Sequence, residues 1–409
     1  MPDAPHDRDI LRALAARIAE VAALPVHRDK ADLWRRLNRL ERVKPPVWIN
    51  ELPWDELLPE SALQCRDPFC REHERAMRQL LYQWDHLPGD MTVDDCLFAP
   101  LVIHDTGFGL EAAAVIPEHY FGAKDYRPII RDEADVERIV TPQVTVDREA
   151  SERDRQRLET LVGDIIPVES RGITSTWFAP WDILITWWGV TEAFTDMVDR
   201  PELVHRGVSR MVDALVGRLE QYEALGALSL NNGYHRVGSG GLGHTDLLPQ
   251  GDFDGHVRPI DMWGTATAQI FVGVSPEMHW EFALQYELRY LERFGLNCYG
   301  CCEPLHHKVD MLRRIPRLRR ISMSRWVDVD RGAAEIGGDC IFSYKPNPAV
   351  LAAEAWNPEA ARAELRDVLD RTRGCPVEVI MKDVSTVRGE PRRIWEWAQL
   401  AREVTEEYA

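Results

Sequence analysis

The chain has 409 residues, of which 45% are hydrophobic and 28% are charged, as is usual for a folded protein with a substantial core. Its formal net charge of -18 argues against a general surface for nucleic acid or for an anionic membrane. No apolar run approaches the ~20 residues that cross a bilayer. The first residues lack a secretory pattern, and the eight cysteines suggest free thiols or metal ligands. We therefore expect a cytoplasmic protein.

The first part of the chain has a helical pattern. Apolar residues recur at helical spacing between Asp9 and Leu40, and Pro45 and Pro46 end this pattern. No repeat, low-complexity tract or linker divides the rest of the chain. We therefore expect a helical extension over residues 1–44 and one domain over residues 45–409.

Short apolar runs alternate with helical patterns through this second domain. Such alternation is typical of parallel βα units, and eight of them predict an α/β protein with a closed (β/α)8 barrel of the TIM type. The chemistry of such a barrel lies at the carboxyl ends of its strands. The predicted strands are 47–50, 96–104, 165–170, 227–232, 294–301, 319–324, 340–346 and 376–383.

A glycine-rich segment comes after the fourth predicted strand. Gly238, Gly240 and Gly243 satisfy the pattern G-x-G-x-x-G. The dinucleotide-binding fingerprint also requires a helix directly after the glycines, whereas here Pro249 comes soon after. We reject a dinucleotide site and predict a flexible loop over an active site.

The segment LNCYGCCEPLHHKVD, residues 296–310, concentrates side chains that bind metals. Zinc takes thiolate, imidazole and carboxylate ligands, and a catalytic zinc site keeps one position open. Alternation along the strand places Cys301 at its last position, with Cys302 and Glu303 in the next turn. The predicted metal ligands are Cys301, Cys302, Glu303, His235 and His307. The alternative is that the thiols are small buried side chains of a packed barrel.

Several stretches resemble the uroporphyrinogen decarboxylase superfamily, which includes zinc-dependent methyltransferases linked to corrinoid proteins. The resemblance extends from about Leu33 to the end of the chain. Its most specific part is a Val-Ser-Pro-Glu segment at 274–277, which leads into a helix and then into the strand with the metal motif. The stretches that carry it are RLERVKPPVWI, DMWGTATAQIFVGVSPEMHWEF, NCYGCCEPL, FSYKPNPAVL and DVSTVRGEPRRIWEWA.

The sequence also departs from that family. Its decarboxylases grip propionate groups with an arginine-rich loop after the first strand, whereas this chain has the acidic segment INELPWDEL. Its methyltransferases use a His-x-Cys pair and a later Cys. Here Tyr299 takes the place of the His, Cys301 keeps the Cys, and Lys382 and Asp383 lie near the last position. The carrier motif D-x-H-x-x-G is absent, so a corrinoid would come on a partner protein.

The resemblance implies a zinc-dependent methyltransferase that moves a methyl group between a small O-, N- or S-methyl compound and a corrinoid protein or a thiol. Zinc would activate a thiol or a poor leaving group. A homo-oligomer is left open. The predicted catalytic residues are Glu303, Asp383 and Lys345, and the predicted substrate-binding residues are Asn231, Asn232, Trp263, Gln269, Tyr299, Tyr344 and Trp177.

Two alternatives stay open. One is a metal-independent decarboxylase or lyase, in which Lys345 or Lys382 holds a carboxylate while Asp383 or a tyrosine moves a proton. The other is a non-catalytic binder of a corrinoid or another tetrapyrrole, with the tryptophan-rich segment around Trp177 as its platform.

Overall fold

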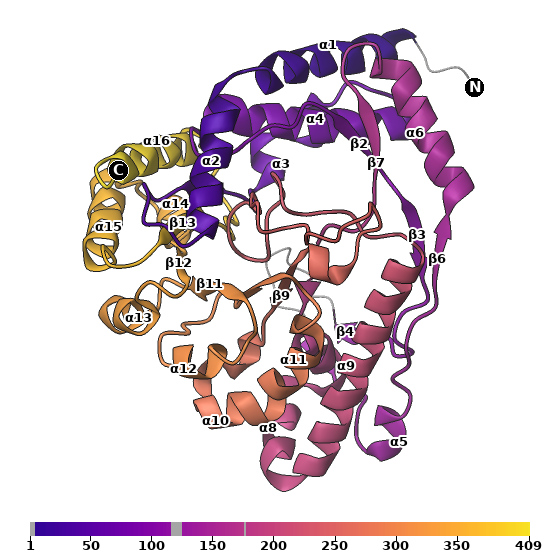
Figure 1. The fold of residues 1–409 in the computed structure, drawn as a ribbon, viewed down its shortest axis with the longest axis vertical. Coiled ribbons are helices and arrows are strands. Elements are labelled where there is room, and N and C mark those ends of the chain that lie inside the picture. Colours follow the sequence, from indigo (N-terminus) through magenta and orange to yellow (C-terminus); the bar gives the residue numbers. More distant parts are fainter. Residues whose placement is uncertain (1–4, 116–124, 176) are drawn as a thin grey trace.

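The structure is a computed structural model that describes residues 5–115, 125–175 and 177–409. It begins with two helices, as the apolar spacing predicts. In α1 (Pro5–Ala22), Leu11 and Ile18 lie buried on the face that packs against α4 (Pro68–His86) and α6 (Arg148–Val162). Figure 1 shows these three helices together at one end of the molecule.

The second helix, α2 (Val26–Asn38), packs into the body of the protein. Its Trp34 and Leu37 form one buried cluster with Leu242, Ile341 and Ile380. Residues from the predicted extension and from the predicted barrel therefore share a core. The division at residue 44 stays a prediction.

Seven parallel strands form one curled sheet, with helices around its outer side (Figure 1). Their hydrogen bonds do not continue from the last strand back to the first among the described residues, so the sheet is a half-barrel and closure of the predicted (β/α)8 ring is not shown. In spatial order the strands are β1 (Val47–Ile49), β13 (Val377–Met381), β12 (Ile341–Tyr344), β11 (Leu318–Met323), β10 (Leu296–Tyr299), β9 (Trp263–Ala266) and β8 (Trp177–Phe178).

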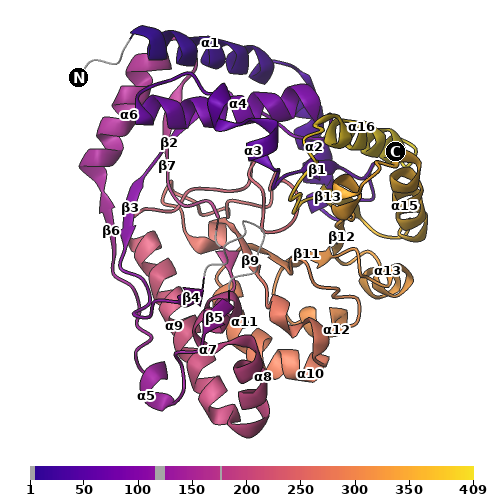
Figure 2. The ribbon, with the colours of Figure 1, turned by 180° about the vertical axis from the view of Figure 1, so that it is seen from behind.

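Three two-stranded pairs lie outside this sheet. The predicted strand 96–104 is two strands, β2 (Leu97–Pro100) and β3 (Val102–Asp105). The first pairs in parallel with β7 (Val168–Arg171), and the second pairs antiparallel with β6 (Val144–Asp147). Figure 2 shows β3 and β6 along one edge of the molecule, leading toward α5 (Glu133–Val136). The third pair is β4 (Ala113–Val115) with β5 (Asp125–Arg127).

One predicted strand is nearly absent, and two strands of the main sheet, β8 and β9, were not predicted. The predicted strand 227–232 has a single β-bridge, between Leu228 and Ile173. Its place in the main sheet is taken by β9, whose sequence WGTA is too short and too rich in small residues to show an apolar alternation.

The remaining helices cover the outer face of the sheet and its edges. Among the described residues, no helix has both the length and the apolar character needed to cross a membrane. These helices are α3 (Trp54–Leu57), η1 (Glu60–Ala62), α7 (Pro180–Trp188), α8 (Val190–Asp199), α9 (Pro201–Ala224), η2 (Pro259–Asp261), η3 (Gln269–Gly273), α10 (Pro276–His279), η4 (Trp280–Leu284), α11 (Gln285–Leu291), α12 (Val309–Leu312), α13 (Val329–Ile336), α14 (Ala349–Ala352), α15 (Pro358–Arg371) and α16 (Arg392–Glu406).

The inner face of the sheet carries a buried ion pair. Arg320 Nε lies 3.0 Å from Glu378 Oε1, and the two side chains are 1% and 0% exposed. Arg320 also donates to Asn38 Oδ1 at 3.0 Å, and the Ser343 hydroxyl donates to Glu378. Buried charges are retained in proteins when they are paired in this way.

The glycine-rich segment fills the space inside the curl. Figure 1 shows it in the middle of the molecule, between β7 and the main sheet. Gly241 N–H donates to Glu378 at 3.2 Å, and a Cβ on Gly240 or Gly241 would overlap Glu378 and Arg320 or Trp34. The prediction of a flexible loop over a site is therefore corrected. The glycines are there because this segment packs closely against buried side chains.

Candidate functional site

The site lies at the carboxyl ends of β1, β10 and β13, as the barrel rule predicts. Gly300 is the first residue after β10. Its φ of 94° favours glycine, and a Cβ at this position would overlap the Leu305 side chain. The next peptide is fixed on both sides. The Cys301 N–H donates to Glu303 Oε2 at 2.9 Å, and the Ser322 hydroxyl donates to the Cys301 carbonyl.

This turn brings two thiols together beside a lysine. Cys301 Sγ and Cys302 Sγ lie 3.4 Å apart, and Lys382 Nζ lies 3.6 Å from the first and 3.5 Å from the second. Cys302 Sγ also lies 3.1 Å from Asp383 Oδ2. Cys301 is buried whereas Cys302 is exposed, so the cluster opens to solvent on one side.

Two carboxylates and a second cation complete the cluster. Lys382 Nζ lies 2.7 Å from Asp383 Oδ2 and 3.2 Å from Glu51 Oε2. Glu51 Oε1 accepts a hydrogen bond of 2.6 Å from Arg236, which also donates to Asn50 Oδ1 at 2.8 Å. Glu51 and Asp383 both have positive φ angles, of 52° and 57°. Such strained conformations in non-glycine residues occur often at functional sites.

The neighbours of Cys301 favour its thiolate. The Cys302 thiol, as a hydrogen-bond donor, lowers the pKa of Cys301 below its ordinary value, and Lys382 and Ser239 lower it further against the effect of burial. The pKa of Cys302 is raised, chiefly by the same hydrogen bond. The pKa of Lys382 is raised by Cys301 and Asp383, although burial alone would lower it. The arrangement supports one thiolate beside one protonated lysine.

The three predicted catalytic residues take different positions. Asp383 lies in the cluster. Glu303 is buried and accepts hydrogen bonds from Cys301 N and from the Thr267 hydroxyl, which is 2.9 Å away, so it braces the turn. Lys345 is buried on the inner face, where its ammonium donates to the Ser343 carbonyl at 2.9 Å and where burial lowers its pKa to about 8.

The predicted metal ligands do not converge as a set. Among the described residues, no group of three or more His, Cys, Asp or Glu side chains is placed to hold a metal ion. Both ring nitrogens of His235 are buried, and neither has a hydrogen-bond partner in the described part of the chain; its ring lies 4.5 Å from that of Tyr234. The ring of His307 lies 5.0 Å from that of His306.

The cluster itself also does not fit a zinc ion in this arrangement. Lys382 Nζ lies within 3.6 Å of all four donor side chains, Cys301, Cys302, Glu51 and Asp383. The ammonium therefore takes the position at which a cation bound by those donors would sit. A metal ion there would have to displace Lys382, and we derive no chemical step through one.

Most of the predicted substrate-binding residues have structural contacts. Asn231 bonds to the backbone of Thr174 and Trp263, and Asn232 donates to Leu248 O at 2.7 Å. Trp263 is fully buried and donates to Gly243 O at 3.0 Å. Gln269 bonds to Asp182, Tyr344 donates to Glu364, and Trp177, 37% exposed, lines a cavity of about 110 Å³ with Tyr222 and Tyr290.

The tryptophan-rich segment around α7 is mainly core. Trp181, Trp187 and Trp188 are buried, and Trp188 donates to Asp196 at 2.7 Å. This favours the packing interpretation over a flat binding platform for a tetrapyrrole.

A second polar cluster lies on the outer face of β10 and is sealed. Tyr299 donates to Glu287 at 2.7 Å and lies 2.7 Å from His279 Nε2, and Lys308 Nζ lies 3.2 Å from His279 Nδ1. All four side chains are buried. Burial raises the pKa of Glu287 to about 8 and lowers that of Lys308 to about 8. Tyr299, predicted to bind substrate, belongs to this cluster.

Arg236 and Ser239 are the members of the site that sequence reasoning missed. Both belong to the glycine-rich segment, for which the sequence predicts a flexible loop. A signal was present, because Arg236 comes four residues after the predicted strand 227–232, at the edge of the sheet where the chemistry of a barrel lies. The sequence does not reveal that its partner is Glu51, 185 residues away.

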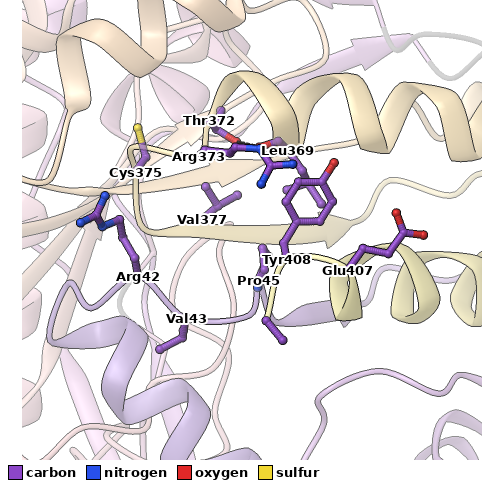
Figure 3. Close-up of a pocket in the computed structure, with 11 residues that line it drawn as sticks. Arg42, Val43, Pro45, Leu369, Thr372, Arg373, Cys375, Val377, Glu407 and Tyr408 are labelled. Carbon is purple, nitrogen blue, oxygen red and sulfur yellow. Dashed lines mark hydrogen bonds between the residues drawn. The ribbon is translucent and has the colours of Figure 1, made fainter.

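The pocket in Figure 3 lies at the opposite end of β13 from Lys382. It has a volume of about 300 Å³ and includes Val377, the first residue of that strand, with Arg42 on one side and Tyr408 on the other. The guanidinium of Arg373 lies over the Tyr408 ring at 4.8 Å. Because the amino ends of barrel strands generally serve stability, this pocket does not compete with the thiol cluster as the reaction site.

Comparisons with known proteins bear on the fold. No protein-family model matches the chain, and no curated protein matches it in sequence. Among solved structures, the chain is similar to a methyltransferase from Methanosarcina mazei, with a TM-score of 0.50 and 9% sequence identity over 93% of this chain and 98% of the other. At this identity the likeness shows the fold alone. The resemblance to the uroporphyrinogen decarboxylase superfamily stays a prediction.

Proposed function

We propose that this protein is a methyltransferase that moves a methyl group between a small O-, N- or S-methyl compound and a thiol or a corrinoid protein, with Cys301 as the reacting sulfur. The observation that carries the proposal is the placement of Cys301 beside Cys302 and Lys382 at the open carboxyl edge of the parallel sheet. A nucleophilic thiolate at that edge suits transfer of a small electrophilic carbon. The methyltransferase of similar fold adds support at the level of the fold.

The first step would be a displacement at the methyl carbon. The Cys301 sulfur forms a bond to that carbon while the bond from the carbon to the substrate heteroatom breaks. The heteroatom leaves with the electron pair of the broken bond and takes a proton from the Lys382 ammonium, which lies 3.6 Å from Cys301 Sγ. The products are a methylated Cys301 and the demethylated substrate, and Lys382 then regains its proton from water.

The charges around Lys382 support this role. Glu51 and Asp383 balance the charges of Lys382 and Arg236, so the Cys301 thiolate is the one additional anion of the cluster. Its methylation removes that anion. The reverse step restores it beside the ammonium, so the cluster stabilises Cys301 as a leaving group as well as a nucleophile.

An acceptor must then take the methyl group from Cys301. A corrinoid on a partner protein, or a second thiol, would supply this chemistry. Zinc is the cofactor that the sequence resemblance implies, but the position of Lys382 among the four donor side chains argues against it. We expect protein purified without added metal to carry much less than one zinc per chain. About one zinc per chain that disappears in Cys301→Ala would restore the metal hypothesis.

The test uses reduced full-length protein and a panel of small compounds that carry a deuterated O-, N- or S-methyl group. We expect the label on Cys301 with at least one compound, located by peptide mass spectrometry, and its loss when a cob(I)alamin or thiol acceptor is added. Cys301→Ser should carry no label. Cys96→Ser is the matched control, because Cys96 is a partly exposed thiol outside the cluster. Label that never appears on Cys301, together with turnover that survives in Cys301→Ser, would overturn the proposal.

The metal-independent decarboxylase stays the second candidate, because Lys382 and Arg236 supply two cations at the same edge of the sheet. A carboxylate substrate could displace Glu51 or Asp383 from them. Release of carbon dioxide from a small carboxylic acid, lost in Lys382→Met and retained in Cys301→Ser, would favour this candidate.

A further inference from the structure

The two neighbouring thiols allow chemistry that methyl transfer does not use. Cys301 Sγ and Cys302 Sγ lie 3.4 Å apart, and Cys302 is exposed. The other cysteines are placed differently: Cys65, Cys70, Cys298, Cys340 and Cys375 are buried, and Cys96 is partly exposed outside the cluster.

We propose that Cys301 and Cys302 are a site of reversible oxidation, at which a disulfide between adjacent residues closes and switches the nucleophile off. The modifying agent is a small disulfide of the glutathione type. This oxidation goes beyond the proposed function, since closing the ring needs no methyl donor.

The geometry favours closure of this ring. A disulfide bond is about 2.0 Å long. The two sulfurs, now 3.4 Å apart, must therefore approach each other by about 1.4 Å. Cys302 faces solvent, and the turn that holds it starts at Gly300 in the left-handed region. The exposed side chain can therefore move toward Cys301, whose backbone is held by Glu303 and Ser322.

The charges of the cluster tolerate the loss of the thiolate. Once both sulfurs are neutral, Lys382 keeps Asp383 at 2.7 Å and Glu51 at 3.2 Å, and Glu51 keeps Arg236 at 2.6 Å. Two cations then face two carboxylates. Each charged side chain of the oxidised cluster therefore keeps a partner of opposite charge. The free-energy cost of burying a charge is low when the charge is paired in this way.

The reaction has two exchange steps. The accessible Cys302 sulfur attacks oxidised glutathione and passes its proton to the Cys301 thiolate, 3.4 Å away. The S–S bond of glutathione breaks, and one glutathione leaves as a thiolate that takes a proton from water. Cys301 Sγ then attacks Cys302 Sγ and releases the second glutathione, which takes the proton of Cys301. The protein loses two electrons and one proton, and the two glutathione thiols gain these together with one proton from water.

The ring should also open readily. Adjacent α-carbons are about 3.8 Å apart across a trans peptide, whereas most disulfides join α-carbons that are about 4.4–6.8 Å apart. A bond formed at the shorter spacing is strained, and strained, exposed disulfides are the ones that thiols reduce easily. Reduction returns the thiolate to its place beside Lys382.

The test treats reduced full-length protein with oxidised glutathione near pH 7.5, then blocks free thiols with iodoacetamide after unfolding. We expect the peptide that contains both cysteines to lose two hydrogens, with Cys298 alkylated and Cys301 and Cys302 protected. A short treatment with reduced glutathione should restore both thiols. Cys96→Ser should behave as wild type.

Two variants separate ring closure from simple adduct formation. Cys301→Ser lacks the second thiol, so a glutathione adduct should accumulate on Cys302. Cys302→Ser lacks the accessible thiol, so modification at Cys301 should slow severalfold. Circular dichroism establishes that each variant is folded. A stable adduct on Cys302 of the wild type, or a bond from Cys301 to Cys298, would overturn the proposal. Because the readout is a mass, a failed methyl-transfer assay leaves this result unaffected.

Discussion

The strands β11, β12 and β13 bury different side chains on the two faces of the sheet. The outer face presents Ile321, Phe342 and Val379 to the main hydrophobic core, and each fully buried apolar side chain there stabilises the fold by about 1.5–3 kcal/mol. The inner face carries Arg320 and Glu378, which are stable in the interior because each is the other's partner. Apolar packing therefore holds the sheet together, while the polar interior fixes one arrangement of the segments that meet inside it.

Removal of the inner ion pair should have the largest effect on stability. Glu378→Gln leaves the buried Arg320 without its carboxylate, and we expect a loss of about 3–5 kcal/mol in the free energy of unfolding. Urea denaturation measures it. Glu149→Gln is the control, because Glu149 pairs with Arg153 on the surface and its side chain is 87% exposed. Equal losses of unfolding free energy in the two variants would show that the buried pair contributes no more to stability than a pair on the surface.

A smaller loss should result when a methyl group is added to the packed glycine-rich segment. A Cβ on Gly243 would overlap the Asn231 carbonyl and lie 2.9 Å from Val237. We expect Gly243→Ala to lower the free energy of unfolding by about 1–3 kcal/mol, as overpacking of a core does. At Gly233 the same atom would meet no described atom within 4 Å. If Gly233→Ala and Gly243→Ala are equally stable, the segment is looser than the structure indicates.

At the open end of the inner face, the lysine should control the reactivity of the thiol. Lys382→Met removes the cation beside Cys301, so we expect the pKa of Cys301 to rise and its alkylation by iodoacetamide near pH 7 to slow by about tenfold for each pKa unit. Peptide mass spectrometry across a pH series gives the rates. Lys382→Arg keeps the charge and should retain most of the reactivity. An unchanged pH profile in Lys382→Met would exclude this role.

The outer cluster should have the smallest effect, visible as a change in how stability depends on pH. Burial raises the pKa of Glu287 in the folded chain to about 8, from an ordinary value of 4.5. The folded chain therefore keeps a proton that the unfolded chain releases. The stability from this proton is complete below pH 4.5 and is lost as the pH rises through 8.

We therefore expect stability to fall less steeply between about pH 5 and pH 8 in Glu287→Gln than in the wild type. His279, whose pKa burial lowers to about 3, acts in the opposite direction in both proteins. Tyr299, Glu303 and Asp182 are the other ionisable groups that act on the Glu287 carboxyl. Urea denaturation at several pH values gives the difference between the two proteins. Identical slopes would contradict the prediction.

Much of the second half of the fold was predictable. The strands that became β10, β11, β12 and β13 are apolar runs between helical patterns, and the structure confirms all of them. The strand β6, which pairs with β3, was missed because it lies in a partly exposed, charged segment. The strand β9 was missed because its four residues, WGTA, include one large apolar side chain and therefore show no alternation of apolar and polar residues.

The site was predictable to the extent that it lies at strand ends. Cys301, Cys302 and Asp383 were predicted from their places after β10 and β13, and the structure brings them together. The zinc ligand set was not found, because spacing along the chain does not reveal that Lys382 points between the sulfurs. Arg236 was missed for the same reason, since its contact with Glu51 depends on how the glycine-rich segment is folded.

The interior filling of the sheet also has a consequence for the order of folding. Asn38 bonds to His244 across 206 residues and to Arg320 across 282, and Gly241 bonds to Glu378 across 137. Contacts between positions so far apart in sequence form late, because a long stretch of chain must first be brought into place. The strands β9 to β13 are neighbours along the chain and can pair early, whereas β1 pairs with β13 across more than 300 residues. The inside of the curl is complete only when the beginning, middle and end of the chain have come together. We therefore expect the thiol cluster, whose contacts join Glu51, Arg236, Cys301 and Lys382 across the length of the chain, to be completed late in folding.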